Sequence, residues 1–290
     1  MLHHLPTELI LLVCDHLSGG HPDAIDPTDH ARTLAPLLLV NKRMNVIVSR
    51  RLWRSPYIRR EYQLRRLMDV LTTSHQDPRQ TTHAYHDMVQ RLTFGHFLNR
   101  CLTDVHIQLF LKTCTSSLRS LNLGNCIHLT NETLKTIARH CTQLEVFYLE
   151  DVYERPRYSV EALCMFVSSC RHLKDAGFYR CPAITDPVLQ TMAEHNEHLS
   201  KLVLFDCGRF TATGGLQALI DRCLKLDSII ITSRFLSESE AMHELAVRCR
   251  RAYITVSSAS NDVRIVKHHG DAQHEVERRR HGQQTESIFG

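Results

Sequence analysis

A repeat of 26 to 29 residues runs through the chain and constrains its fold more than any other feature. In each copy, apolar residues stand three, four and seven positions before a closing cysteine or asparagine, which is the spacing of one helical face. The closing residues are Cys114, Cys141, Cys170, Asn196, Cys223 and Cys249. Six copies at so narrow a period predict a stack of similar units.

A short strand-like segment follows each closing residue. In one copy it reads Leu199, Leu202 and Leu204, and its final alternation is typical of a strand with one buried face. Three residues later a second cysteine recurs, at Cys126, Cys181 and Cys207. One strand and one helix cannot bury an apolar face alone, whereas stacked copies can, so we expect a curved solenoid.

The segments LRSLNLGNCIHLT and LSKLVLFDCGRFT carry this pattern, which resembles the cysteine-containing leucine-rich repeat over roughly residues 88–257. The resemblance implies an α/β fold. It would be a right-handed solenoid of about six repeats, with parallel strands on the concave side and helices on the convex side.

The cysteines fit a packing role. Eight of the eleven fall at the two repeat positions, where a small apolar thiol with a weak donor suits a tight buried turn. Val152 and Asn196 replace cysteine in register, which favours packing over metal ligation. The alternatives are a Cys–His nucleophile pair and a metal site among His268, His269, His274 and His281. We predict no catalytic residue, no metal and no cofactor.

Residues 5–54 have a different organisation. LPTELILLVCDHL predicts a helix with Leu9, Ile10, Val13 and Leu17 on one face, and ARTLAPLLLVNKRMNVIVSRRLWRS predicts a second apolar helix. The opening Leu5-Pro6-x-Glu8-Leu9, the VNKR at 40–43 and the LWR at 52–54 resemble an F-box. In two respects the chain departs from that family: residues 18–32 form a longer loop, and Met44 stands where an aromatic residue is frequent.

These patterns predict four segments. They are an all-helical F-box at 1–57, a linker helix and connector at 58–87, the leucine-rich solenoid at 88–257, and a tail at 258–290. Low apolar content predicts that the tail is disordered. An F-box directly before such a solenoid is a recurring architecture, which makes the two resemblances support each other.

The combined resemblance implies a substrate receptor of an SCF-type cullin–RING ubiquitin ligase, which is an adaptor and not an enzyme. Its F-box would dock on a Skp-type adaptor subunit and, through it, reach the cullin and RING subunits. The resemblance assigns this contact, or the core that supports it, to Leu5, Pro6, Leu9, Ile10, Val13, Leu37, Leu38, Val40 and Trp53. Two alternatives stay open: an F-box scaffold that regulates a partner without its degradation, and an unrelated solenoid scaffold.

Composition and charge argue against membrane-spanning, secreted and nucleic-acid-binding proteins. No apolar run approaches about 18 residues, so we expect no membrane span. The N-terminus lacks the features of a secretory signal, and we expect a cytoplasmic or nuclear protein. The net charge of +4 is too small to indicate nucleic-acid binding. Nine Lys/Arg lie between Lys42 and Arg66 with Glu61 as the single acid; a solvated surface or a partner contact is favoured there over nucleic acid or nuclear import.

Strand alternation predicts where a protein substrate would bind. If the repeat leucines point inward, the residues between and beside them face the concave side. We expect an exposed apolar and aromatic patch made of Tyr148, Tyr179, Val203, Phe205 and Ile230, rimmed by Glu150, Asp175 and Lys201. Such patches mark interaction sites, and aromatic residues dominate interface energetics. The alternative is that the rings are covered by the tail or pack on each other.

Overall fold

The computed structural model describes residues 6–17, 32–58, 60–94, 101–114, 116–151, 156–232, 253–257, 262–266 and 277–280. The chain divides into two compact units, Met1–Leu123 and Gly124–Gly290. We call them the N-terminal and the C-terminal unit. This boundary divides the chain into its two most compact parts. It does not test the four segments expected from the sequence, which remain a prediction. No helix in the described ranges is both long and apolar enough to cross a bilayer.

The N-terminal unit begins with three helical elements, α1 (Thr7–Leu17), the 3-10 helix η2 (Ala35–Leu39) and α3 (Lys42–Arg54). They share a core of Ile10, Cys14, Leu34, Met44 and Val48, with Leu37, Leu38, Ile47 and Leu52 packed partly buried around it. Of the face that the helical periodicity predicts for α1, Ile10 is buried in this core, whereas Leu9 and Val13 are exposed.

The second apolar helix is broken where the sequence predicts continuity. The Asn41 side chain accepts a hydrogen bond from the Met44 N–H at 2.9 Å and begins α3, so η2 and α3 are separate elements. Asparagine competes for backbone donors in this way and is therefore favoured at helix N-caps. Val40, at the break, is 49% exposed, although the apolar run predicts burial.

The rest of the N-terminal unit already has a strand–helix character. Strands β1, β2 and β3 are parallel neighbours in that order. The expected linker helix is α4, which buries Leu64, Leu67 and Leu71. Trp53 packs on Tyr85 with the ring centroids 4.3 Å apart. The elements are β1 (Tyr57–Ile58), α4 (Glu61–Gln76), η3 (Pro78–Gln80), η4 (Tyr85–Asp87), β2 (Arg91–Phe94), α5 (Asp104–Thr113) and β3 (Ser120–Leu123).

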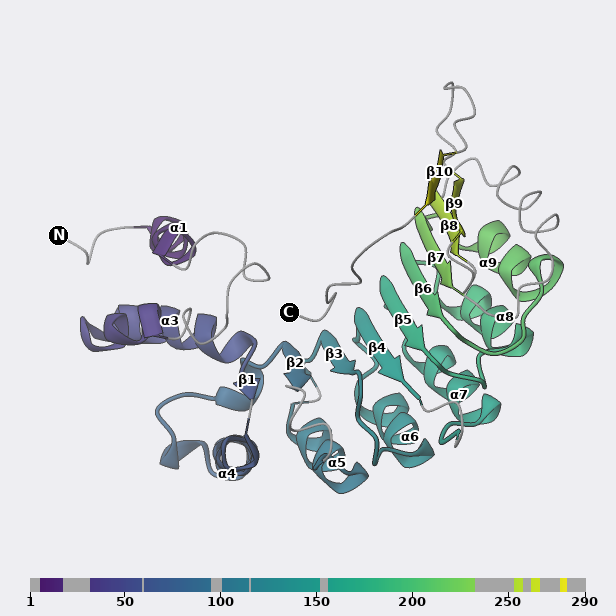
Figure 1. The fold of residues 1–290 in the computed structure, drawn as a ribbon. Helices are drawn as coiled ribbons and strands as arrows, with labels where there is room; N and C mark the ends of the chain where they lie inside the picture. Colours follow the sequence, from purple (N-terminus) through teal and green to yellow (C-terminus); the bar gives the residue numbers. More distant parts are fainter. Residues whose placement is uncertain are drawn as a thin grey trace. The chain divides into compact units, whose positions relative to one another are not determined.

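The C-terminal unit is a layered stack of strand–helix repeats. Strands β4 to β8 are parallel neighbours in sequence order, and helices α6 to α9 lie on one face of the sheet that β4 to β7 form (Figure 1). The expected helix that closes at Cys249 lies outside the described residues. The elements are α6 (Asn131–His140), β4 (Val146–Glu150), α7 (Val160–Ser169), β5 (Asp175–Tyr179), α8 (Asp186–His195), β6 (Lys201–Phe205), η5 (Ala212–Leu216), α9 (Gln217–Arg222), β7 (Ser228–Thr232) and β8 (Tyr253–Ser257).

The core of the C-terminal unit lies between these two layers. The alternating strand residues that the repeat predicts to point inward are buried, as Phe147 and Leu149 illustrate. The Phe147 ring lies 4.3 Å from that of Phe166 on α7, centroid to centroid. Each such side chain contributes about 1.5–3 kcal/mol through burial. The opposite face of the sheet carries no helix within the described residues (Figure 1).

The closing residues of the repeat form a ladder of hydrogen bonds. The Cys170 thiol donates to the Cys141 carbonyl at 3.5 Å, the Asn196 amide to the Cys170 carbonyl at 2.7 Å, and the Cys223 thiol to the Asn196 carbonyl at 3.5 Å. Asparagine can replace cysteine here because each supplies a donor to the preceding repeat. These contacts agree with the packing role predicted for the cysteines. Within the described residues, no group of three His, Cys, Asp or Glu could hold a metal ion.

Burial should also make these thiols unreactive. It raises the pKa of Cys126 and Cys207 from 9.0 to about 12, and that of Cys114 and Cys223 to about 11. A pKa of about 12 in place of 9.0 lowers the fraction of thiolate at pH 8 about 1000-fold. The thiolate is the form of cysteine that reacts as a nucleophile. We expect iodoacetamide to modify the exposed Cys101 in the native protein and to leave these four intact, as measured by peptide mass spectrometry.

The raised pKa values of the buried thiols also make the free energy of unfolding depend on pH in the alkaline range. The folded state holds these protons more tightly than the unfolded state, so the associated stability is present below about pH 9 and falls as pH rises toward 12.

Equal labelling of Cys126 and Cys101 by iodoacetamide in the folded protein would contradict the assignment of Cys126 as buried.

Two strands lie in the segment that the sequence predicts to be disordered. β9 (Asp262–Val266) pairs antiparallel with β8, and β10 (Glu277–Arg280) pairs antiparallel with β9. The unpaired edge of a parallel sheet offers backbone donors and acceptors to any extended segment, which composition alone does not register. The remainder of 258–290 lies outside the described residues.

Candidate protein-interaction surfaces

The helix-free face of the C-terminal unit aligns its side chains in columns. One column joins Tyr148, Gly177, Val203 and Ile230, and the next joins Glu150, Tyr179, Phe205 and Thr232. A third joins Val146, Asp175, Lys201 and Ser228. This is the register that the repeat spacing predicts, because every strand enters the sheet at the same phase of the repeat.

Three aromatic rings form a row on this face, and we call Tyr148, Tyr179 and Phe205 the aromatic row. The ring centroids are 6.4 Å apart between Tyr148 and Tyr179, and 6.0 Å apart between Tyr179 and Phe205. These distances lie within the range in which aromatic pairs attract each other. Of the three, Phe205 is the most exposed, at 44%.

Gly177 determines how Tyr148 lies. A Cβ at Gly177 would stand 2.4 Å from the Tyr148 Cδ1, so the tyrosine ring covers the glycine of the neighbouring strand. The Tyr148 hydroxyl donates to Asp175 Oδ2 at 2.8 Å. Ring and hydroxyl are therefore both held on β5, which makes this end of the row preorganised.

Both tyrosines of the row stay neutral at physiological pH. Burial raises the pKa of Tyr148 well above its ordinary value of 10, and the hydrogen bond and charge of Asp175 raise it further. Burial also raises the pKa of Tyr179, again with help from the Asp175 charge. The row therefore offers apolar ring surface and phenol hydroxyls but no negative charge of its own.

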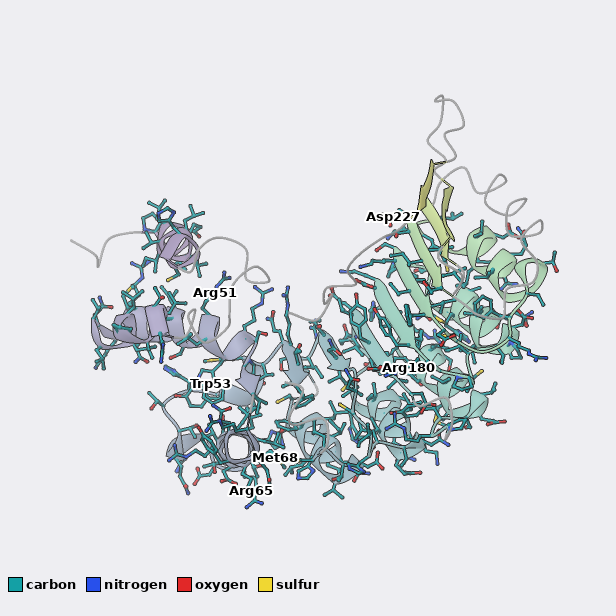
Figure 2. All side chains as sticks on the ribbon, viewed as in Figure 1. Arg51, Trp53, Arg65, Met68, Arg180 and Asp227 are labelled. Atoms are coloured by element: carbon teal, nitrogen blue, oxygen red, sulfur yellow. The ribbon has the colours of Figure 1, made fainter. Side chains whose placement is uncertain are left out.

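The charged groups around the row are paired. Lys201 Nζ lies 3.6 Å from Asp175 Oδ2. Glu150 accepts a hydrogen bond from the Asn125 N–H at 2.7 Å and pairs with Arg180, which follows β5 and is labelled in Figure 2. Charge at this rim is balanced, so ring contacts dominate what the face can offer to a partner.

The exposed patch expected from sequence is smaller than predicted. Glu150 is only 7% exposed because Asn125 and Arg180 hold it, and Val203 is only 8% exposed. Tyr148, Tyr179, Asp175, Lys201 and Ile230 are half-buried. The rings also pack on each other, as the alternative interpretation anticipated. Whether these residues bind a substrate remains a prediction.

A buried ion pair that the sequence reasoning missed holds the end of β4. The Asp151 side chain is fully buried, and its Oδ1 accepts from the Arg157 Nε at 3.1 Å and from the Arg157 N–H at 3.2 Å. Arg157 Nη2 also donates to the Glu150 carbonyl at 2.9 Å. The sequence did contain a clue to this ion pair. Asp151 and Arg157 are six residues apart in the one repeat in which Val152 replaces the second cysteine.

The residue before the second cysteine adopts a left-handed backbone conformation, another feature missed from sequence. Asn125, Arg180 and Asp206 have φ of 59°, 51° and 50°. The N–H of Arg180 donates to the Phe205 carbonyl at 2.7 Å, which extends the ladder beyond the strand. Asn and Asp at this position are a recognisable signal, whereas arginine is not.

A second surface lies on α1, which is apolar on two sides. Ile10 and Cys14 are buried against α3, whereas Leu9, Leu12 and Val13 are 45–62% exposed. Leu39, the last residue of η2, is 90% exposed. Leu12 and Leu39 were not predicted from the sequence. Each is an apolar residue on the second side of a helix, and that position could have identified them.

The nine residues predicted to bind or support an adaptor therefore separate into groups. Ile10 belongs to the core, Leu37 and Leu38 pack partly buried against it, and Trp53 packs on Tyr85. The exposed ones are Pro6, Leu9, Val13 and Val40. Leu5 lies outside the described residues. The adaptor contact itself remains a prediction.

Comparison with known proteins bears on the fold. No family model matches the chain, and no curated protein matches it. A solved structure does match, the crystal structure of the Rad7 and Elc1 complex in yeast, with 16% sequence identity and a TM-score of 0.54. The match covers 86% of this chain and 65% of the other. The fold is that of a leucine-rich-repeat-like solenoid. This chain therefore spans less than two thirds of the length of the chain it matches.

One cluster in the N-terminal unit has the composition of a hydrolase triad. Ser74 Oγ lies 3.0 Å from His86 Nδ1, and His86 Nε2 lies 3.5 Å from Asp87 Oδ1. However, Ser74 is fully buried, and its hydroxyl also donates to the His83 carbonyl at 3.3 Å. A nucleophile must reach the reacting atom, and the buried Ser74 hydroxyl instead makes hydrogen bonds that tie the connector to α4.

Proposed function

We propose that this protein is a substrate-recognition adaptor of an SCF-type cullin–RING ubiquitin ligase, working in the cytoplasm or the nucleus. The α1–α3 region would be the F-box that docks on a Skp-type adaptor subunit. The helix-free face of the C-terminal unit would hold the protein substrate. The residues offered to the substrate are Tyr148, Asp175, Tyr179, Lys201, Phe205 and Ile230, while the buried Glu150 and Val203 would support them from within the same face.

The double apolar character of α1 carries this proposal. One side of the helix completes the local core, and the other side exposes Leu9, Leu12 and Val13, three large apolar side chains at helical spacing. A helix that is apolar on both sides is favourable only where both sides are buried. A hydrophobic partner surface is therefore the expected complement of α1. The matched solenoid was itself crystallised in a two-protein complex.

The proposed mechanism requires no chemistry from this chain. Holding a substrate and a ubiquitin-charged enzyme in one assembly makes their encounter intramolecular, which raises the effective concentration to the millimolar range for a suitable geometry. Binding on two distinct surfaces of one chain is what this role demands.

The docking surface can be tested by co-purification. The variant Leu9→Asp, Leu12→Asp, Val13→Asp should lose the Skp-type subunit, because three desolvated contacts become charged; we expect at least a 100-fold loss of affinity. Helix content by circular dichroism should be unchanged, since these side chains point away from the core. A matched control is Val105→Asp with Leu224→Asp, which charges exposed apolar residues elsewhere.

The outcomes separate the candidate functions. Recovery of cullin together with ubiquitination of a captured protein supports the ligase role. Recovery of the Skp-type subunit without cullin or ubiquitination favours the scaffold that regulates a partner without degradation. Full recovery of the Skp-type subunit by the triple variant would show that α1 is not the docking element.

A further inference from the structure

The loops that follow β5 and β6 present positive charge. Residues 180–185 and 206–211 contain three charged side chains, of which Arg180 and Arg209 are exposed and Asp206 is buried. Asp186, the next acidic residue after β5, begins α8 and accepts three hydrogen bonds from the segment that follows β6. We call Arg180 and Arg209 the arginine pair.

The ion pair of Arg180 with Glu150 is neutral in sum but has a definite orientation. The Arg180 side chain is 47% exposed, whereas the Glu150 side chain is 10% exposed. The Asn125 N–H holds Glu150 in this buried position. A partner that approaches from solvent therefore meets the guanidinium and not the carboxylate. The hydrogen bond to Glu150 comes from Nη2, and a guanidinium has further N–H donors with which to bind that partner.

The backbone holds Arg180 in a conformation that arginine does not favour. Its φ of 51° lies in the left-handed region, which asparagine and aspartate tolerate better than other residues with a side chain. The residues at the corresponding repeat positions, Asn125 and Asp206, are of the tolerant kind. The Arg180 N–H donates to the Phe205 carbonyl at 2.7 Å, which fixes this position. Residues that the surrounding structure keeps under strain are concentrated at functional sites.

The arginine pair borders the exposed end of the aromatic row. Phe205, the most exposed ring of the row, ends β6 and lies four residues before Arg209. Its carbonyl accepts the hydrogen bond from Arg180. The two loops are also bonded to each other, because the Gly208 N–H donates to the Cys181 carbonyl at 3.0 Å. One apolar ring and two guanidinium groups therefore lie at one packed edge of the sheet.

We infer that this edge recognises an acidic residue of the substrate, an Asp or Glu that stands beside a bulky apolar residue. The apolar residue packs on Phe205, and the carboxylate binds the arginine pair. This rests on the proposed function for the presence of a protein substrate and names the chemistry of the segment that is bound. The rings supply most of the contact and the arginines supply selectivity, because charge at an interface discriminates between partners more than it adds affinity.

A carboxylate fits this edge better than a phosphate group does. A planar guanidinium binds a carboxylate through two parallel hydrogen bonds. A phosphorylated segment is instead held by a cluster of arginines, which matches its double negative charge. Here Glu150 already neutralises one of the two cations, so one net positive charge remains for a single negative charge.

A protein segment also fits better than a single strand of nucleic acid. Such strands stack successive bases on a series of exposed aromatic rings. In the aromatic row, Tyr148 and Tyr179 are half-buried and pack on their neighbours, which leaves Phe205 as the ring with a largely open surface.

Selection from a phage-displayed library of random 12-residue peptides on the full chain tests the inference. The wild type should enrich peptides in which Asp or Glu stands within two positions of Leu, Ile, Met or Phe. The variant Arg180→Glu, Arg209→Glu should enrich Lys or Arg there instead, because the complementary charge is reversed. For the most enriched peptide, changing its acidic residue to the amide should weaken binding to the wild type at least tenfold, as measured by fluorescence anisotropy.

Two further variants make the result specific to this edge. Arg139→Glu with Arg171→Glu reverses two exposed cations of the helical layer and, like the variant of the arginine pair, changes the formal net charge from +4 to 0. It should bind the peptide within about twofold of wild type, because its charges are not at the interface. Arg209→Glu alone keeps the ion pair of Arg180 with Glu150 and should weaken binding at least fivefold, so the test holds even where reversal of Arg180 prevents folding.

Each outcome supports or overturns the inference. No enriched peptide, enriched peptides without Asp or Glu, or equal binding by wild type and Arg209→Glu overturns it. Binding that strengthens more than tenfold when phosphoserine replaces the acidic residue would assign the edge to phosphate. Displacement of the peptide by a 20-nucleotide single-stranded DNA, at a lower concentration than the unlabelled peptide requires, would assign it to nucleic acid. Either result would show that the carboxylate assignment is wrong.

The proposed function is judged by a separate measurement. Recovery of the Skp-type subunit should be the same for the wild type and for the variants of the arginine pair, because these changes lie in the C-terminal unit. Loss of the expected peptide selectivity with normal recovery overturns this inference and leaves the proposed function standing. Absence of recovery by the wild type, with the expected selectivity, overturns the ligase role and leaves the assignment of the edge intact.

Discussion

Replacing Arg157 with alanine is expected to lower the unfolding free energy of the C-terminal unit by about 3–5 kcal/mol. The change removes the guanidinium that pairs with the fully buried Asp151 carboxylate, and removing one partner of a buried ion pair has a penalty of that size. It also removes a hydrogen bond to the Glu150 carbonyl at the end of β4. Urea unfolding followed by far-ultraviolet circular dichroism measures the loss.

Two comparisons make the result specific to this ion pair. Lys135→Ala breaks the exposed pair with Glu132 and should change stability by less than about 1 kcal/mol. The double change Arg157→Met, Asp151→Leu removes both charges and should regain part of the loss. Trp53 is the single tryptophan of the chain and lies in the N-terminal unit, so its fluorescence should be unaffected. A loss below 1 kcal/mol for Arg157→Ala would mean that the pair does not hold β4.

Removing the aromatic row is expected to abolish substrate capture. The variant Tyr148→Ala, Tyr179→Ala, Phe205→Ala deletes three rings, and truncating an interface aromatic commonly costs about 2 kcal/mol or more, so affinity should fall at least 100-fold. Recovery of the Skp-type subunit should stay intact. Proximity labelling in cells, quantified by mass spectrometry for wild type and variant, identifies the proteins that depend on the row.

Two further variants control for lost surface and for ring position. Tyr62→Ala, Met165→Ala, Leu224→Ala removes exposed apolar side chains elsewhere and should leave capture unchanged. Gly177→Val keeps all three rings but places side-chain atoms where the Tyr148 ring lies, so it should weaken capture without removing any aromatic group. If the triple alanine variant captures the same proteins as wild type, the substrate binds elsewhere.

The repeat made most of the C-terminal unit predictable. Its period placed the strands, the helices and the buried leucines, because burial of one side per element is a local property of the sequence. It also predicted the columns of the helix-free face, since parallel strands that begin at the same repeat position fall in register. Tyr148, Tyr179 and Phe205 could therefore be named as neighbours although they are 26 to 31 residues apart.

The details of the candidate surfaces depended on contacts that periodicity does not describe. Alternation placed Glu150 and Val203 on the helix-free face, and both lie there, but their burial depends on the side chains beside them. Likewise, the sequence predicted the apolar residues of α1 without separating Ile10, which faces the core, from Leu9 and Val13, which do not. Packing against α3 made that distinction.

The sequence by itself determined the repeating strand–helix architecture, the inward residues and the order of the columns, because each follows from short-range periodicity repeated along the chain. The tertiary structure alone decided the ion pair of Asp151 with Arg157, the position of the Tyr148 ring over Gly177, and the break before α3 at Asn41. It also decided that β9 and β10 extend the sheet. These features arise from specific hydrogen bonds, steric fit and an open sheet edge, whose energies depend on which atoms meet in three dimensions and not on the spacing of residue types.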